Sequence, residues 1–311
     1  MSHVGMATQR MLEMIGRAGY AYPTKPMGEV FFVDHTNGDN DHDGQNKDSP
    51  LQTITEALTR CVDSRDDMIL VLNCWDSEPD TITVNKRMVH IIGLGIQGGL
   101  GASLPAIGDT PVFTLPAAGS KVEIAGFSIG GGNDCPGIEL NNNYGSWIHN
   151  CWFGHVGVGQ TPRDGITNDV PAGNHNYNGI RIENCKFLGN HQGKGHGTLS
   201  RYGIHFGGSG INGQDAHILN NRFMNCSYAI RIVYGLDQII EHNYIKIPVD
   251  DAIGRGIYYH AGTGSLIVEN KATDDGADAM ANAAFYDNQV ANNAWLCNQE
   301  GILDVFPDTS L

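Results

Sequence analysis

A six-residue pattern recurs through the second half of this chain, and it constrains the fold more than any other feature. The pattern reads aliphatic, any residue, Asn, Asn or Cys, any residue, Phe. The six copies end at Phe127, Phe153, Phe187, Phe223, Ile245 and Ala272, and each has Val or Ile five positions earlier. Such internal periodicity is typical of a solenoid, in which each repeat packs on its neighbours.

The pattern predicts short strands stacked in parallel. Each copy holds a brief β-rich piece bounded by Gly and Asn, not a long run of period 3.6. Asn at the third position before the end suits a tight bend, because Asn tolerates the left-handed conformation. A second column supports two inward strands per coil: Ile138, Ile230 and Ile257 lie ten residues before Ile148, Ile240 and Ile267.

The segment from Val30 to Leu58 strengthens this interpretation. It holds a strand, a turn rich in Gly, Asp and Asn, then a Pro and an amphipathic helix whose apolar face is Ile54, Ala57, Leu58 and Cys61. This order resembles the opening motif of pectate-lyase-like proteins. The resemblance covers residues 30 to about 300. It implies an all-β fold, a right-handed single-stranded parallel β-helix with a short N-terminal capping helix and an extended N-terminal arm.

Four parts are expected along the chain. They are an N-terminal anchoring arm (residues 1–28), a first strand with its turn and capping helix (29–66), the parallel β-helix (67–290) and a C-terminal cap (291–311).

Composition and charge exclude several classes of function. The chain has 19 Lys and Arg against 34 Asp and Glu, a net charge of −15, which disfavours a nucleic-acid partner. No apolar run reaches the roughly 18 residues of a membrane span. The seven cysteines show no disulfide or zinc spacing, and the N-terminus lacks the features of a secretory signal. Synthesis and assembly in a cytoplasm are therefore expected.

The first 28 residues do not fit the repeat. They combine a short Met-rich amphipathic stretch with an extended arm rich in Gly, Tyr and Pro. We expect this arm to dock on a capsid or tail protein, although it would alternatively fold back over the first coil. The predicted anchoring residues are Met11, Met14, Ile15, Tyr20 and Tyr22.

Carboxylates are the first candidates for catalysis, since enzymes that the fold resembles work with carboxylate clusters. Asp250, Asp251 and His196 resemble the paired aspartates and the Gly-His-Gly of polygalacturonases. Here the aspartates follow the histidine, whereas in that family they precede it, and no Arg-Ile-Lys motif follows. Turn chemistry at the corners of coils is the alternative interpretation of these residues.

Asp39, Asp41 and Asp43 suggest a calcium loop. With Gly44 they match the first six positions of an EF-hand, but Pro50 stands where a bidentate Glu is needed. Ca²⁺ is therefore the one cofactor considered, and no other is expected.

Aromatic and histidine side chains are the candidates for binding a substrate. Two insertions, residues 154–177 and 189–202, are rich in Gly, Asn and His and lack a hydrophobic pattern. The predicted substrate-binding residues in or near them are Tyr202, His205, Trp152 and Tyr258. Outward aromatic rings suit either a subunit interface or a sugar ligand.

Two functions follow from these observations. The first is a structural virion protein, a phage or viral spike, fibre or capsid-decorating protein, which would be a homotrimer and touch host glycans. Its location would be the virion, assembled in the host cytoplasm. The alternative is an extracellular enzyme, a polysaccharide lyase or glycoside hydrolase acting as a depolymerase. A glycan-binding adhesin without catalysis is a third, weaker interpretation.

Overall fold

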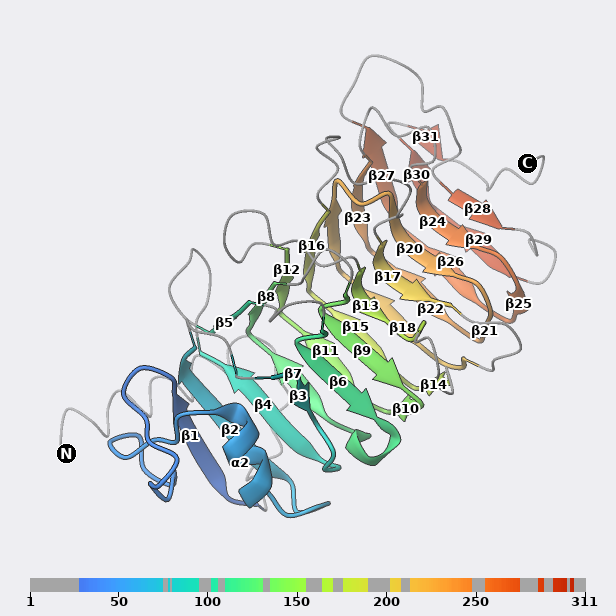
Figure 1. The fold of residues 1–311 in the computed structure, drawn as a ribbon. Helices are drawn as coiled ribbons and strands as arrows, with labels where there is room; N and C mark the ends of the chain where they lie inside the picture. The colour runs from blue at the N-terminus through green and yellow to red at the C-terminus, as the bar shows by residue number, and fades with distance from the viewer. Residues whose placement is uncertain are drawn as a thin grey trace, which may run out of the picture.

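A computed structural model shows the chain wound into successive coils along one axis (Figure 1). The structure describes residues 28–74, 78, 80–94, 102–105, 110–130, 135–154, 164–169, 176–189, 202–207, 213–247, 255–274, 285–287, 293–300 and 303–304. Three long sheets and two small ones make up these coils, and the three long sheets are parallel apart from one terminal pairing.

The ten-stranded sheet runs the whole length of the molecule. Its strands in spatial order are β1 (Val30–Asp34), β2 (Asp67–Asn73), β4 (Val89–Gly93), β7 (Glu123–Ala125), β11 (Trp147–His149), β15 (Arg181–Glu183), β18 (His217–Leu219), β22 (Ile239–Glu241), β26 (Leu266–Val268) and β29 (Ala294–Leu296).

The nine-stranded sheet follows it in each coil. Its strands are β5 (Ser103–Leu104), β8 (Ser128–Ile129), β12 (Trp152–Phe153), β16 (Lys186–Leu188), β19 (Arg222–Met224), β23 (Tyr244–Ile247), β27 (Lys271–Asp274), β30 (Gln299–Glu300) and the antiparallel β31 (Leu303–Asp304).

The eight-stranded sheet completes the coil. It contains β3 (Ile82–Thr83), β6 (Phe113–Pro116), β9 (Ile138–Asn141), β13 (Asp164–Thr167), β17 (Tyr202–Phe206), β20 (Tyr228–Ile232), β24 (Arg255–Tyr259) and β28 (Phe285–Asp287). Two small sheets, β10 (Asn143–Tyr144) with β14 (Tyr177–Asn178) and β21 (Gly235–Leu236) with β25 (Gly262–Thr263), lie on the way back to the ten-stranded sheet. A 3₁₀ turn spans Ala117–Gly119.

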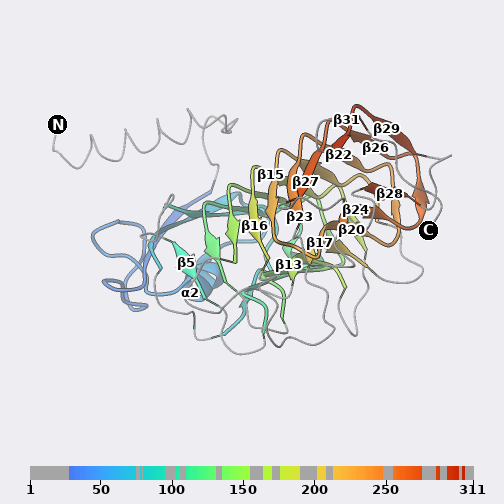
Figure 2. The same ribbon diagram turned by 90° about the horizontal axis from the view of Figure 1, so that it is seen from above.

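The order of the strands confirms the predicted parallel β-helix. Between β2 and β30, sequence-adjacent strands belong to different sheets, and the strands of the three long sheets pair in parallel with their counterparts one coil away. Seen from above, the ten-stranded and eight-stranded sheets lie on opposite sides of the axis, and the nine-stranded sheet faces the viewer (Figure 2). A single hydrophobic core fills the space between the sheets.

The inward columns confirm most of the repeat and correct its first copy. Ile148, Ile182, Ile218, Ile240 and Ile267 are paired in register across the ten-stranded sheet. The first copy is displaced, because Ile148 pairs with Ile124, not Val122, and Phe153 pairs with Ile129, not Phe127. A shift of two residues leaves the same face of a strand inward, and Val122 and Phe127 are also buried. The hydrophobic pattern therefore does not distinguish the predicted register of the first copy from the observed one.

Two neighbouring positions form the corner between the ten-stranded and nine-stranded sheets, and they have different roles. The first adopts the left-handed conformation, with φ of 51° at Asn150, 53° at Asn184 and 56° at Asn220. The second is buried and links the coils: Asn221, Asn243, Asn270 and Asn298 pass hydrogen bonds from coil to coil. In the earlier coils, Cys151 and Cys185 hold this second position, and each thiol lies near a carbonyl of the preceding coil.

The capping helix forms as predicted. Helix α2 (Ile54–Arg60) begins at the N-cap Thr53, whose hydroxyl accepts a hydrogen bond from the backbone N–H of Glu56. Ile54, Ala57 and Leu58 are buried against the first coil. The carboxylate of Glu78 also accepts hydrogen bonds from the backbone N–H groups of Ile54 and Thr55, so a residue of the first coil fixes the start of the helix.

Two boundaries differ from the prediction. The insertion predicted over residues 154–177 contains β13, a regular strand of the eight-stranded sheet. Its inward side chains include only one large aliphatic residue, Ile166, which explains why no pattern was visible. The coils also continue past residue 290: Trp295 pairs with Ile267, and Asn298 extends the amide ladder.

A column of small residues faces the stacked phenylalanines inside the coils. A Cβ at Gly165 would lie 2.5 Å from Cδ1 of Phe187, and a Cβ at Gly203 would lie 2.5 Å from Cδ1 of Phe223. Glycine at these positions therefore lets the aromatic rings fill the interior. Among the described residues, no helix is long and apolar enough to cross a membrane.

Candidate functional site: the outer face of the eight-stranded sheet

Two outward columns on β17, β20, β24 and β28 gather tyrosine and arginine side chains. In the first column, Tyr202, Tyr228 and Arg255 are paired from coil to coil. In the second, His205, Arg231, Tyr258 and Tyr286 are paired in the same way. We call Tyr202, Tyr228, Arg231, Arg255, Tyr258 and Tyr286 the Tyr–Arg face.

Cation–π contacts hold the Tyr–Arg face together. The Arg231 guanidinium lies 5.2 Å from the ring centroid of Tyr202, and 6.0 and 5.9 Å from those of Tyr228 and Tyr258. Arg255 lies 5.4 Å from the ring centroid of Tyr258 and 4.8 Å from that of Tyr286. Because these contacts fix long side chains on rigid strands, the face is preorganised for a ligand.

His205 joins this face to two carboxylates. Nη1 of Arg231 lies 3.1 Å from Nε2 of His205; since a guanidinium only donates, Nε2 accepts and the ring proton is on Nδ1. Nδ1 lies 3.9 Å from Oδ2 of Asp164 and 3.8 Å from Oδ2 of Asp169. His205 and Asp164 are buried, whereas Asp169 is exposed.

Arg255 has an unused donor. Its Nη1 is shielded from solvent, and no hydrogen-bond partner for it exists among the described residues. Leaving a charged donor unpaired is costly, about 1–3 kcal/mol or more. Tyr258 beside it is less acidic than usual, because burial raises the pKa of its phenol, so its hydroxyl stays protonated as a donor. At this end of the face, Nη1 of Arg255 could therefore donate a hydrogen bond to an added acceptor.

The structure brings together three of the four predicted substrate-binding residues. Tyr202, His205 and Tyr258 lie on this face, but Trp152 lies on the outer side of the nine-stranded sheet. Sequence reasoning did not point to Arg231, Arg255 or Tyr286, which lie on the same face. A signal was present: the face occupies the positions two before and one after Ile204, Ile230 and Ile257, and one after Phe285.

The other predicted site residues fall mostly outside the described parts of the chain. The predicted catalytic set Asp250, Asp251 and His196 lies there, and so do the predicted anchoring residues Met11, Met14, Ile15, Tyr20 and Tyr22. These assignments stay predictions.

The predicted calcium loop is built from turns. The Asp39 carboxylate accepts a hydrogen bond from the backbone N–H of Asp41, and that of Asp43 accepts one from Gln45. Arg60 of the capping helix donates to the backbone carbonyls of Asn40 and His42. Within the described residues, no group of three or more His, Cys, Asp or Glu is placed to hold a metal ion.

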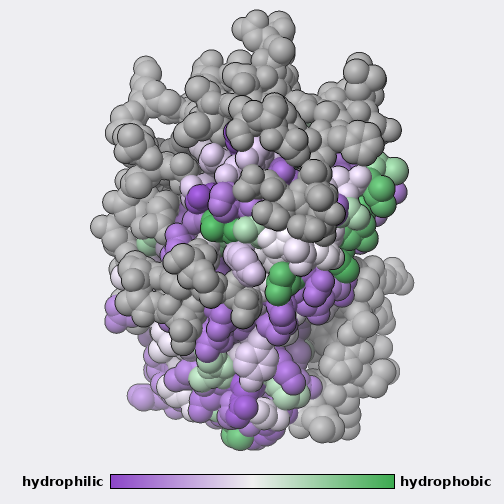
Figure 3. Space-filling view, turned by 90° about the vertical axis from the view of Figure 1, so that its right-hand side faces the viewer, coloured by the Kyte–Doolittle hydropathy of each residue, from purple (hydrophilic) through white to green (hydrophobic). Residues whose placement is uncertain are grey.

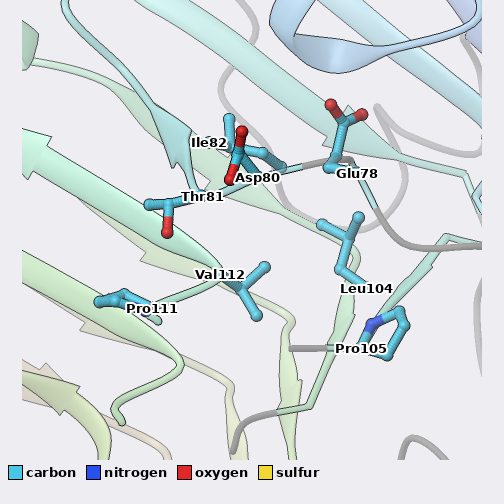
Figure 4. Close-up of a pocket in the computed structure, with 8 residues that line it drawn as sticks. All are labelled: Glu78, Asp80, Thr81, Ile82, Leu104, Pro105, Pro111 and Val112. Carbon is cyan, nitrogen blue, oxygen red and sulfur yellow. The ribbon is translucent and has the colours of Figure 1, made fainter. Parts of the chain in front are cut away.

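A small pocket near the first coils offers little chemistry. It is lined by Glu78, Asp80, Thr81, Ile82, Leu104, Pro105, Pro111 and Val112 (Figure 4). The Glu78 carboxylate is already engaged by the start of helix α2. The lining is otherwise mostly apolar, so this pocket is a weaker candidate than the Tyr–Arg face.

A charged network lies on the outer side of the ten-stranded sheet. Glu123 binds His90 through Nδ1 at 2.5 Å and His149 through Nε2 at 2.7 Å, and His90 also binds Asp66 at 2.9 Å. Burial acts to raise the pKa of Glu123, but the hydrogen bonds from the two histidines outweigh it and lower the pKa to about 2. Burial acts to lower the pKa of His90, but its two carboxylate partners raise it overall.

The same sheet becomes apolar toward its C-terminal end. Ile239, Leu266 and Val268 are half-buried there, and Leu296 is 53% exposed. Seen from the side of the C-terminal coils, hydrophobic residues gather along the right-hand edge of the molecule (Figure 3). The three outer faces of the β-helix therefore differ in chemistry.

Comparison with known proteins gives structural likeness only. No family model matches the sequence, and no curated protein matches it. The solved structures that are similar include ORF18 of Geobacillus virus E2, with 13% identity and a TM-score of 0.46 over 87% of this chain and 62% of that one. Pectate lyase Pel9A has 13% identity and a TM-score of 0.49, covering 91% and 79% of the two chains.

A third likeness is to the GH136 lacto-N-biosidase of Eubacterium ramulus, with 14% identity and a TM-score of 0.42 over 94% of this chain and 57% of the enzyme. All three likenesses are at low sequence identity. The strand pairing described above establishes the parallel β-helix independently of these likenesses.

Proposed function

We propose that this chain is a structural virion protein, a spike, fibre or capsid-decorating protein, that contacts surface glycans through its Tyr–Arg face. The observation that carries the glycan contact is the alignment of four tyrosines and two arginines in two columns. Tyrosine offers an apolar ring and a polar hydroxyl, and arginine offers five donors, which together suit a ligand with both C–H faces and hydroxyl groups.

The virion setting is supported by the state of the cysteines. None of the seven is part of a disulfide, and six of them are buried. Burial raises the pKa of Cys61 and of Cys226 to about 12, so these thiols stay protonated and inert. Free thiols are typical of proteins that fold in a reducing cytoplasm, where virions assemble.

Binding to a panel of immobilised bacterial and host-surface glycans tests the glycan contact. We expect Tyr202→Ala and Tyr258→Ala each to weaken binding about tenfold, which corresponds to roughly 1.4 kcal/mol. The matched control is Tyr144→Ala, an exposed tyrosine on β10 away from this face. Equal binding by the wild type and both face variants would show that the glycan site lies elsewhere.

Immuno-electron microscopy tests the virion setting. Antibodies against the purified protein should label particles isolated from a producing culture. Label confined to the particle-free fraction would contradict the structural role, whatever the outcome of the glycan panel.

A polysaccharide-cleaving enzyme is the second candidate, and His205 is the observation that favours it. Its Nδ1 lies 3.8 Å from the exposed carboxylate of Asp169 beside the Tyr–Arg face, so Asp169 is a reasonable general base and His205 the residue that positions it. Incubation with acidic and neutral polysaccharides should then shorten the chains, and His205→Gln should abolish the shortening while glycan binding persists. Unchanged chain length with the wild type would exclude this candidate for the polysaccharides tested.

A further inference from the structure

A second outward column, on the nine-stranded sheet, concentrates positive charge. Trp152, Lys186, Arg222, Tyr244 and Lys271 are paired in register on five successive strands, β12 to β27. We call these five residues the cationic row. Lys246 lies beside it on β23. The Tyr–Arg face belongs to a different sheet, so the two surfaces are separate.

The aromatic residues of the row hold its cations in place. The Lys186 ammonium lies 5.3 Å from the ring centroid of Trp152, and the Arg222 guanidinium lies 5.4 Å from that of Tyr244. The Tyr244 hydroxyl is 3.3 Å from the hydroxyl of Thr273. Both rings therefore restrict flexible side chains that would otherwise move freely in water.

Within the described parts of the chain, three cations of the row lack the acidic partners that five other cations have. Lys47, Arg60, Arg65, Arg87 and Arg181 each form an ion pair with Asp or Glu. By contrast, no carboxylate among the described residues lies within 4.0 Å of the charged nitrogens of Lys186, Arg222 or Lys271. These three side chains are exposed. Their charge is thus available to an external anion.

We propose that the cationic row binds a linear acidic polysaccharide laid along the axis of the β-helix. Neighbouring strands of a sheet lie about 4.8 Å apart, so Lys186 and Arg222 lie one strand apart along the axis and Lys271 lies two strands beyond Arg222. A polymer that carries a carboxylate or sulfate on successive sugars presents anions in the same way. This inference is independent of the glycan contact proposed for the Tyr–Arg face.

The net charge of −15 does not prevent this contact. At physiological ionic strength the Debye length is about 8 Å, so distant carboxylates are screened while cations in direct contact are not. Binding should therefore depend on cations that touch the polymer directly. It should weaken steadily as the salt concentration rises, because binding releases counterions from the polymer.

The chemistry of the row favours a polysaccharide over other polyanions. Binding of single-stranded nucleic acid uses free aromatic platforms on which bases stack, whereas each ring of this row already has a cation against it. Protein interfaces are depleted in lysine at their centres, whereas lysine is the commonest residue type among these cations.

Titration of the full chain with heparin, polygalacturonate, neutral dextran, single-stranded DNA and polyglutamate, at several salt concentrations, tests the proposal. The variants are Lys186→Gln, Arg222→Gln and the pair together, with Lys121→Gln as the control for an exposed lysine elsewhere. We expect affinity for heparin or polygalacturonate to fall about fivefold per substitution and the salt slope to fall by about 1 per cation removed.

Unchanged binding by the double variant, equal binding of dextran, or a preference for DNA or polyglutamate would each overturn the proposal. Tyr258→Ala should leave polyanion binding unaltered; loss of polyanion binding in that variant alone would assign the ligand to the Tyr–Arg face instead. Thermal melting of each variant checks that it remains folded, which is expected because the substituted side chains are exposed.

Discussion

At the scale of single residues, the coils are joined by buried amides as well as by the backbone. Asn243 accepts hydrogen bonds from the backbone N–H and the side-chain amide of Asn221, and its own amide donates to the carbonyl of Ile218 and to Asn270. One side chain therefore satisfies polar groups on both neighbouring coils. Each buried asparagine of the ladder is a point where the stack can be weakened locally.

Asn243→Ala is expected to destabilise the protein by about 1–3 kcal/mol, because it leaves buried donors and an acceptor unpaired. Chemical denaturation measures the change. The control is Asn178→Ala, an exposed asparagine of β14, which should change stability little. Equal effects of the two substitutions would mean that the ladder does not contribute.

Glu123 should make the folding stability of the protein depend on pH in the acidic range. Its pKa in the folded protein is about 2, against an ordinary value of 4.5. A lowered pKa stabilises the fold above the ordinary value, and this contribution is lost as pH falls from about 4.5 toward 2. His90 has a raised pKa, so its contribution is complete below its ordinary value of 6.5 and is lost as pH rises through its folded pKa.

Melting temperatures measured from pH 2 to pH 9 check this expectation. Glu123→Gln should flatten the fall between pH 4.5 and pH 2, whereas Glu241→Gln, on the same sheet, should retain the dependence of the wild type. A Glu123→Gln profile parallel to that of the wild type would contradict the role of the network.

At the scale of elements, stacked rings make up much of the interior beside the nine-stranded sheet. The ring of Phe187 lies 4.7 Å from those of both Phe153 and Phe223, with interplanar angles of 2° and 8°. Neighbouring coils are thus in contact through aligned rings, and the small residues opposite leave room for them. Packing of this kind resists any change of volume.

Phe187→Ala should therefore cost about 3–5 kcal/mol of stability, the range for removing a buried aromatic ring. Leu188→Ala is the control, since Leu188 is the next residue of β16 but is half-buried on the outer side. Urea unfolding of both variants makes the comparison. A loss below about 1 kcal/mol for Phe187→Ala would show that the stack relaxes around the gap.

The sequence predicts those elements that repeat with a clear pattern. Ile148 and Ile182 mark the inward columns, Asn184 and Asn220 mark the left-handed corner, and Ile54 and Ala57 mark the apolar face of the capping helix. All of these features depend on residue types that recur in each repeat or that form a local amphipathic helix. The parallel β-helix follows from them directly.

The remaining elements could not be predicted, because they depend on neighbours in space. The displaced first copy at Phe127 and the strand β13 keep hydrophobic or small residues inward without the usual pattern. The Tyr–Arg face escaped notice because loops of different length separate its members in the sequence. Only alignment on the Ile204 and Ile230 column brings Arg231 beside Tyr202.

At the scale of the whole molecule, one rigid β-helix displays three faces of different chemistry. The ten-stranded sheet carries the Glu123 network and an apolar C-terminal end, the nine-stranded sheet carries the cationic row, and the eight-stranded sheet carries the Tyr–Arg face. Because the three faces lie on different sheets, a ligand on one face need not cover another. The homotrimer stays a prediction, which sedimentation velocity of the full chain tests.

The most direct measurement is a crystal structure of the protein with an oligosaccharide selected from the glycan panel. The account predicts sugar density on the outer face of the eight-stranded sheet, over Tyr202, Tyr228, Tyr258 and Tyr286, with an acceptor within hydrogen-bond distance of Arg255. Sugar density found only on another face, and still present when the crystal is soaked at a lower ligand concentration, would contradict the account.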